Sequence, residues 1–122
     1  MLRCLVTLAA TLAVLFSAFT TLSEGAVGGD PVRGKQVYDM FCLPCHGDKG
    51  DGKGPVGVTL QPPPRDFTVG KFLYGTTDQD LFDTMTNGAV VKGGSELMGE
   101  WKLIIPESDR WAVIAFIRSL KK

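Results

Sequence analysis

Apolar residues recur at helical spacing near the start of the second quarter of the chain. In residues 31–45 they fall three or four positions apart, at Val37, Tyr38, Phe41 and Cys45. This period places them on one face of an amphipathic helix. Asp30 and Pro31 form a typical helix start, with the aspartate as N-cap and the proline at the first helical position. The pattern therefore predicts a single helix over residues 31–45.

Two further helices are predicted nearer the C-terminus. Thr77 and Asp80 have the spacing of a capping box, and an apolar side follows before Asn87-Gly88 ends the helix. The last helix starts near residues 106–109, with acidic residues in its first turn and basic residues in its last turns, as the helix dipole favours. Because no alternating strand pattern occurs in the sequence, the predicted fold is all-α, with three to five helices.

The segments between these helices are long and rich in glycine and proline. They cover residues 47–75, including Pro62-Pro63-Pro64, and residues 89–105. Loops of this length without structure of their own are uncommon in a small domain. We therefore expect them to wrap a large buried group.

The N-terminal segment has the layout of a secretory signal peptide. A positive Met1-Leu2-Arg3 precedes an apolar run, and Ser23-Glu24-Gly25 offers small residues for cleavage. We expect residues 1–25 to be the signal peptide and residues 26–122 to be the exported domain. The alternative is an uncleaved helix that anchors the domain to a membrane, since the apolar run is at the lower limit for spanning.

Charge and size narrow the classes of function. The chain has 13 basic and 13 acidic residues, and the leader contains one of each, so the domain has no net charge and nucleic-acid binding is not expected. A domain of about 97 residues has a small core and needs further stabilisation. The cysteines leave only one close pair outside the leader, which stabilises little as a disulfide. A large buried cofactor would supply the stabilisation that the small core and the single cysteine pair do not provide.

The stretch Cys42-Leu43-Pro44-Cys45-His46 supports three chemistries. A thiol–disulfide couple needs the pair at the start of a helix after a strand, whereas here it lies at the end of a predicted helix. A structural zinc site needs four protein ligands, and these residues supply three in a chain whose single histidine is His46. Cys-x-x-Cys-His is also the attachment signature of c-type haem. That interpretation assigns Cys42 and Cys45 as thioether tethers and His46 as an iron ligand.

The second axial ligand cannot be another histidine of this chain. Methionine is the usual partner in cytochromes c, and three methionines follow the leader. Met40 precedes the tethers on the same helix, and Met85 lies on the apolar side of the middle helix, where core packing is the simpler role. We therefore favour Met98, which lies in a glycine-rich loop; a lysine or amine, water or an open position remain alternatives.

With this Cys-x-x-Cys-His stretch and a methionine about fifty residues after it, the chain resembles the class I cytochromes c, specifically the small monohaem bacterial ones. Gly34, Tyr38 and Cys42 look like the first helix of that family, and Val113 with Phe116 looks like the pair in its last helix. The resemblance implies the cytochrome c fold, with the first and last helices crossing and the loops wrapping one covalent haem c with its iron. It also implies that a proline carbonyl, here that of Pro55, accepts a hydrogen bond from the His46 ring. Many relatives have a proline beside the ligand methionine, and this chain does not.

Two more residues are candidates for the haem environment. Arg65 is either a contact of a haem propionate or a surface charge. Trp101 is either a haem contact or a core aromatic. As a haem contact it would pack at the haem edge or donate its indole N–H there.

The sequence thus predicts an electron carrier of the periplasm, not an enzyme, that exchanges electrons with redox partner proteins. Membrane contact is expected only if the leader is uncleaved. The alternatives are a haem enzyme or gas or peroxide sensor with an open sixth position, and a membrane-tethered cytochrome subunit of a respiratory complex.

Overall fold

The computed structural model describes residues 28–69 and 77–122, so the predicted signal peptide lies outside the described residues. Within these two ranges every regular element is helical, which confirms the all-α class. The α-helices are α1 (Pro31–Phe41), α2 (Leu43–His46), α3 (Asp78–Asn87) and α4 (Glu107–Ser119), with short 3-10 turns η1 (Gly57–Thr59) and η2 (Val90–Lys92). No helix of the described part is long and apolar enough to cross a membrane.

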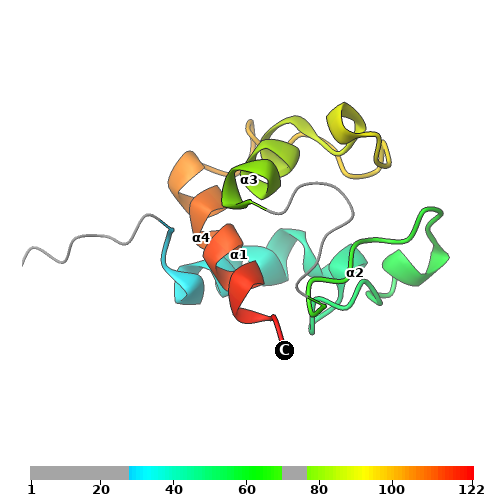
Figure 1. Ribbon diagram of the computed structural model, residues 1–122, viewed down its shortest axis with the longest axis horizontal. Coiled ribbons are helices and arrows are strands. Elements are labelled where there is room, and N and C mark those ends of the chain that lie inside the picture. Colours follow the sequence, from blue (N-terminus) through cyan, green and yellow to red (C-terminus); the bar gives the residue numbers. More distant parts are fainter. Residues whose placement is uncertain (1–27, 70–76) are drawn as a thin grey trace, which may run out of the picture.

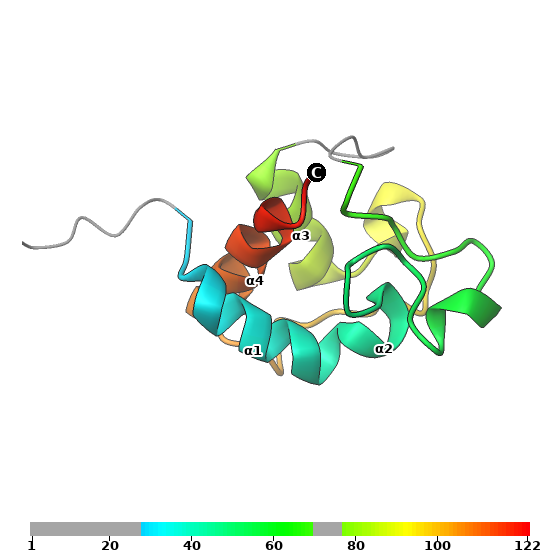
Figure 2. The same cartoon turned by 90° about the horizontal axis from the view of Figure 1, so that it is seen from below.

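The helices gather at one end of the molecule and the loops at the other. α1 and α4 lie against each other, and α3 packs on α4 (Figures 1 and 2). α2 continues from the end of α1 toward the opposite end, where the segments around η1 and η2 lie. The described loop segments around η1 and η2 therefore lie at the same end of the molecule as α2.

The first predicted helix is divided in two, so the expectation of one continuous helix over residues 31–45 was wrong. α1 ends at Phe41, Cys42 caps it with its N–H on the Tyr38 carbonyl, and α2 begins at Leu43. Pro44 explains the break, because it has no N–H to donate to the Met40 carbonyl. The start of α1 is as predicted, since the Asp30 side chain accepts from the Val32 N–H at 2.8 Å.

The crossing of α1 and α4 forms the core. Gly34 lies directly against the backbone of Ala112, and Tyr38 meets Phe116 edge to face with ring centroids 5.0 Å apart. Tyr38, Val113 and Ile114 are almost completely buried. The predicted contact of the first and last helices is thereby confirmed.

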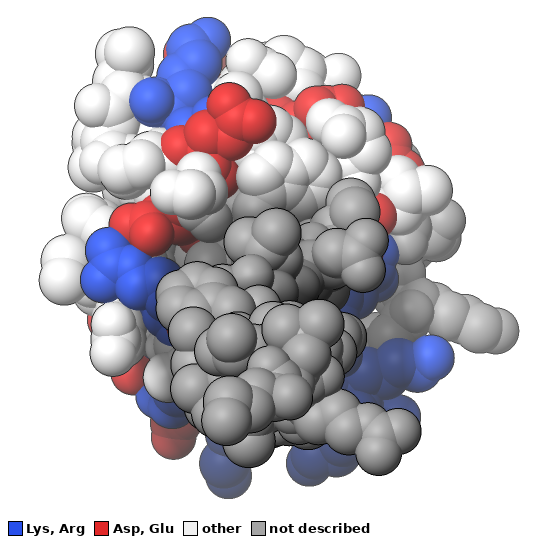
Figure 3. Space-filling model, turned by 90° about the vertical axis from the view of Figure 1, so that its left-hand side faces the viewer, with Lys and Arg blue, Asp and Glu red and all other residues white. Residues whose placement is uncertain are grey.

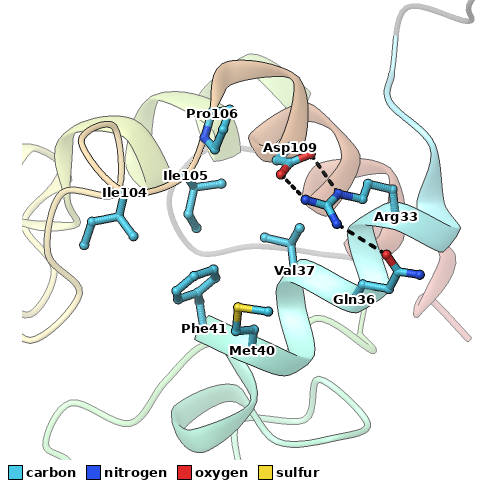
Figure 4. Close-up of a pocket in the computed structure, with 9 residues that line it drawn as sticks. All are labelled: Arg33, Gln36, Val37, Met40, Phe41, Ile104, Ile105, Pro106 and Asp109. Carbon is cyan, nitrogen blue, oxygen red and sulfur yellow. Dashed lines mark hydrogen bonds and ion pairs between the residues drawn. The ribbon is translucent and has the colours of Figure 1, made fainter.

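An ion pair also joins α1 and α4 near this crossing. Arg33 Nε and Nη2 lie 3.0 and 2.6 Å from the two carboxylate oxygens of Asp109. Figure 4 shows the pair at one end of a surface pocket between α1 and the segment that precedes α4. Cys42, Cys45 and His46 do not line this pocket. We therefore do not associate it with the predicted haem site.

α3 begins and ends as its sequence predicts. Thr77 and Asp80 form the reciprocal capping box, and Gly88 follows the last residue, Asn87. Met85 is 4% exposed and belongs to the core, as expected. Asp80 also pairs with Lys92 of η2 at 3.1 Å, so the start of α3 is tied to the loop that follows the helix.

Basic and acidic side chains lie next to each other on the surface. In the upper and left parts of the face shown in Figure 3, lysine and arginine atoms adjoin aspartate and glutamate atoms. This arrangement agrees with the zero formal net charge of the chain and gives that part of the face no large field of one sign.

Candidate functional site

The two cysteines and the histidine lie together in one short helical turn. Cys42 precedes α2, while Cys45 and His46 end it, and the Cys45 and His46 N–H groups both point to the Cys42 carbonyl at 3.2 and 2.9 Å. Both cysteines are free and partly buried. Residues three apart in a helical turn share a face, so the thiols project together and the imidazole follows. This is the arrangement that a cofactor tethered at two points requires.

The protonation of Cys42 does not suit a redox-active thiol. Burial, together with the neighbouring Cys45, raises the pKa of the Cys42 thiol to about 12. A thiol–disulfide couple needs a thiolate near neutral pH. The described residues also contain no group of three or more histidine, cysteine and acidic side chains arranged to hold a metal ion. The raised pKa of Cys42 argues against a thiol–disulfide couple, and the tether role of Cys42 and Cys45 stays a prediction.

The His46 ring is held at one edge and on one face. Its Nδ1 lies 3.4 Å from the Arg65 carbonyl oxygen, and its face stacks on Phe67 with centroids 4.7 Å apart and planes 18° apart. Burial lowers the pKa of His46, which favours the neutral imidazole. If Nδ1 carries the proton toward Arg65, Nε2 keeps a lone pair for a metal ion.

The acceptor for the His46 ring therefore differs from the predicted one. The resemblance implied the Pro55 carbonyl as acceptor, whereas the carbonyl that lies near Nδ1 in the structure is that of Arg65. Pro55 lies exposed in the loop after α2. Its neighbour Val56 donates to the Pro44 carbonyl at 2.9 Å, so this part of the loop follows the backbone of α2.

Glycines allow that loop to lie close to α2. A Cβ on Gly54 would meet the carbonyls of Leu43 and Pro44, and one on Gly57 would meet the carbonyl of Cys45. The loop returns hydrogen bonds to the same turn, including Gly52 N–H to the His46 carbonyl at 2.9 Å. The backbone of the Cys-x-x-Cys-His turn is thus satisfied by its own loop, and its two cysteine thiols are left for another partner.

A buried donor without an acceptor packs against Phe41, the last residue of α1. The Trp101 indole Nε1 is buried and has no hydrogen-bond partner, while its ring packs on Phe41 with centroids 5.6 Å apart. An unsatisfied buried N–H costs about 1–3 kcal/mol. The orphaned N–H fits a cofactor that carries an acceptor group, such as a haem propionate.

Met98 lies in the loop between α3 and α4, and it is partly buried. Its carbonyl accepts from the Ala89 N–H at 2.9 Å, and its own N–H donates to the Ser95 carbonyl at 3.2 Å. At the end of this loop next to α4, the side chain of buried Arg110 donates to the Ile105 carbonyl at 2.6 Å. Among the described hydrogen bonds and ring contacts, none joins the loop directly to His46, so the pairing of Met98 with His46 stays a prediction.

Two contacts of the His46 ring were not predicted from the sequence. The sequence indicated the Arg65 side chain as a candidate, whereas the Arg65 carbonyl is what reaches His46. Nothing in the sequence motifs indicated Phe67, which is 6% exposed. The signal for it was a single aromatic residue within a polar, proline-rich segment, where burial needs a reason.

Comparisons with known proteins agree with this geometry. The family model described as Cytochrome c matches residues 31–121. The chain is 41% identical over 88 residues to a protein of Azospirillum brasilense named Cbb3-type cytochrome c oxidase subunit CcoP, covering 72% of this chain and 28% of that one. It is 28% identical over 107 residues to a thiosulfate dehydrogenase of Stutzerimonas stutzeri, covering 84% and 31%.

A solved structure supports the fold. Cytochrome cL from Hyphomicrobium denitrificans superposes with a TM-score of 0.58 at 27% identity, covering 75% of this chain and 47% of that one. The chain spans less than a third of the length of the curated relatives it matches. The likeness therefore concerns a domain, and the activities of those whole proteins do not follow from it.

Proposed function

The chain belongs to the cytochrome c family, and on that premise we propose that it is an exported carrier of single electrons with His46 and Met98 as axial ligands. Members of the family are electron-transfer proteins that bind haem c with its iron, so haem c is the cofactor of this chain. In the proposal Cys42 and Cys45 form the thioethers. The bound group supplies an iron that alternates between the ferric and ferrous states.

The observation that carries the proposal is the turn of α2. It presents two free thiols and a partly buried imidazole, whose pKa is lowered by burial, within one helical turn, while the following loop satisfies the backbone of that turn. The Cys42 thiol is not set up to react as a thiolate near neutral pH, because burial raises its pKa. The Arg65 carbonyl orients the imidazole and makes it a better donor to the metal.

Two further residues support a haem at this place. Trp101 supplies the buried N–H that lacks an acceptor, and we assign it to a propionate. Arg65 is partly buried, and its side chain is a second candidate for such a contact. Pro55 is left in the loop that covers α2, without the ring contact first assigned to it.

A carrier is favoured over an enzyme or sensor by the residues available. His46 is the single histidine of the chain, so no second imidazole can act as a distal acid or base. A carrier of this kind would meet its redox partners through a small, transient interface. With no net charge, the chain is expected to show association rates that depend only weakly on ionic strength.

Mass spectrometry of the protein produced with a haem-attachment system tests the proposal. The wild type should carry the mass of one haem, keep it under denaturing conditions, and lack residues 1–25. Cys42→Ala and Cys45→Ala together should release the haem on denaturation. A wild type without covalent haem, or a haem that stays attached in the double variant, contradicts the proposal.

The comparisons favour a second candidate, a cytochrome component of a larger oxidase. Four further relatives matched at lower identity are likewise named as subunits of cbb3-type cytochrome c oxidase, CcoP or FixP. In this case the leader would stay attached and the domain would be held near its partner. Isolation from native membranes distinguishes the candidates: co-purification with a terminal oxidase and an intact leader support the second, and a free, shortened protein supports the first.

A further inference from the structure

One face of the His46 ring is covered by an aromatic side chain that no motif of the sequence indicated. Phe67 stacks on the imidazole with ring centroids 4.7 Å apart and planes 18° apart. Phe67 is 6% exposed and belongs to the core cluster. The contact is therefore made inside the protein, where the position of each ring is set by its packing.

The same short segment holds the edge of the imidazole. The Arg65 carbonyl lies 3.4 Å from Nδ1, two residues before the stacked ring. A single hydrogen bond fixes where one ring nitrogen points, but the ring can still tilt about that contact. A flat neighbour removes this freedom, because tilting would push the imidazole into the Phe67 ring or open a void beside it. Edge and face contacts together define the plane of the imidazole.

The segment that makes both contacts is itself fixed at several points. Asp66 accepts from the N–H and the hydroxyl of Thr68 at 2.8 and 2.6 Å, which closes a local turn around Phe67. The Phe67 N–H donates to the Gly50 carbonyl at 2.7 Å. This bond ties the segment to the loop that starts directly after His46.

The end of the last helix completes the support. The Lys122 N–H donates to the Thr68 carbonyl at 3.2 Å. Leu120 packs on the core, and its side chain lies so close to Gly50 that a Cβ there would approach it within 2.5 Å. The position of Phe67 is thus determined by the loop after His46 on one side and by residues 120–122 on the other.

From these contacts we propose that Phe67 is a positioning residue that sets the plane of the His46 imidazole and, through it, the orientation of the proximal ligand about its bond to iron. The inference rests on the proposed role of His46. Phe67 does not touch the reacting atoms in the proposal. It acts by packing, and the Arg65 carbonyl acts with it at the edge of the ring.

The orientation of an axial imidazole has its own spectroscopic signature. In a ferric low-spin haem it determines, together with the orientation of the second axial ligand, how unpaired spin is distributed over the porphyrin, and proton NMR reports this distribution as the order and spread of the haem-methyl resonances. A loss of stability alone does not reorder these signals while the haem stays low-spin. The readout therefore separates positioning from a merely structural role.

Phe67→Leu and Phe67→Tyr, with Phe82→Leu as the matched control, test the inference in the holoprotein. Phe82 is similarly buried at 8% and also stacks on an aromatic ring, that of Trp111, with centroids 4.1 Å apart. Phe67→Leu should reorder the haem-methyl resonances and change how their chemical shifts depend on temperature. Phe67→Tyr should keep the wild-type order of the haem-methyl resonances. Phe82→Leu should lower the melting temperature without changing that order.

Two outcomes overturn different statements. A low-spin wild type whose haem-methyl pattern is the same in Phe67→Leu overturns the inference and leaves the proposed function intact, as does a pattern changed equally by Phe67→Leu and Phe82→Leu. A wild type without a low-spin, histidine-ligated haem overturns the proposed function itself. Should Phe67→Leu fail to fold, the comparison of Phe67→Tyr with Phe67→Trp decides, because the larger ring must displace the imidazole and shift the pattern if the two rings are in contact.

Discussion

Gly34 of α1 lies so close to the carbonyl of Ala112 in α4 that a Cβ at Gly34 would overlap it. The two helices can approach to this distance because Gly34 has no side chain, and Tyr38 and Phe116 then meet one turn further along. The crossing holds the end of α1 in place, and the Cys-x-x-Cys-His turn begins at that end.

Replacing Gly34 by alanine should therefore destabilise the protein. Alanine is the better helix former by about 1 kcal/mol, but overpacking of a tight contact costs about 1–3 kcal/mol or more. We expect a net loss of about 2 kcal/mol in the free energy of unfolding, measured by denaturant titration of the holoprotein. Met40→Ala, at a 69% exposed position of the same helix, should change it by less than about 0.5 kcal/mol. A Gly34→Ala variant as stable as the wild type contradicts the contact.

Tyr38 links α1 to the residue that follows the histidine. Its hydroxyl donates to the Gly47 carbonyl at 2.7 Å in the interior. Tyr38→Phe keeps the ring contact with Phe116 and leaves that carbonyl without its donor, so we expect a loss of about 1–3 kcal/mol. Equilibrium unfolding measures it. An unchanged stability would show that water or another donor replaces the hydroxyl.

Asp80 predicts how stability depends on pH. Hydrogen bonds from Thr77 and the nearby Lys92 lower the pKa of Asp80 from 3.8 to about 2. A carboxyl group with a lower pKa in the folded state stabilises it above its unfolded pKa, and this contribution is lost as the pH falls through the folded value. The melting temperature of wild type should exceed that of Asp80→Asn at pH 7, and the difference should shrink between pH 4 and pH 2.

The matched control for this experiment is Asp83→Asn on the same helix. Among the described hydrogen bonds, Asp83 accepts only the one from the Gln79 side chain. Asp80 in addition forms the capping box with Thr77. We expect a smaller loss at pH 7 for Asp83→Asn. Equal losses in the two variants would mean that the general charge of α3 matters and the cap does not.

The sequence predicted those features that depend on local chemistry. Asp30 and Thr77 cap helices because their side chains reach N–H groups two or three residues away. The break at Cys42 was missed, although Pro44 was visible, because the apolar spacing continues across it. The Arg65 carbonyl could not be predicted, since every residue has a carbonyl and only the path of the loop brings this one to His46. That path depends on Gly50 and the C-terminal end of the chain, both far from residue 65 in sequence.

The identity of the second axial ligand is the prediction on which the carrier function most depends. Met98→Leu nearly conserves volume and removes the sulfur, so folding should change by less than about 1.5 kcal/mol. If Met98 binds the iron, the ferric charge-transfer band near the red end of the visible spectrum should be lost, and the reduction potential should fall because the thioether ligand favours the ferrous state. Optical titration against a redox mediator measures both.

Met85→Leu is the control, because it makes the same chemical change at a core position that is 4% exposed. It should keep the band and lower stability slightly. Loss of the band in Met85→Leu with retention in Met98→Leu would move the ligand to α3. A wild type that is high-spin and lacks the band in the ferric state would leave the sixth position open, and a peroxide- or gas-binding role would then replace the carrier. The ligand thus decides the function, because an iron with both axial positions filled can exchange electrons yet offers no position for a substrate.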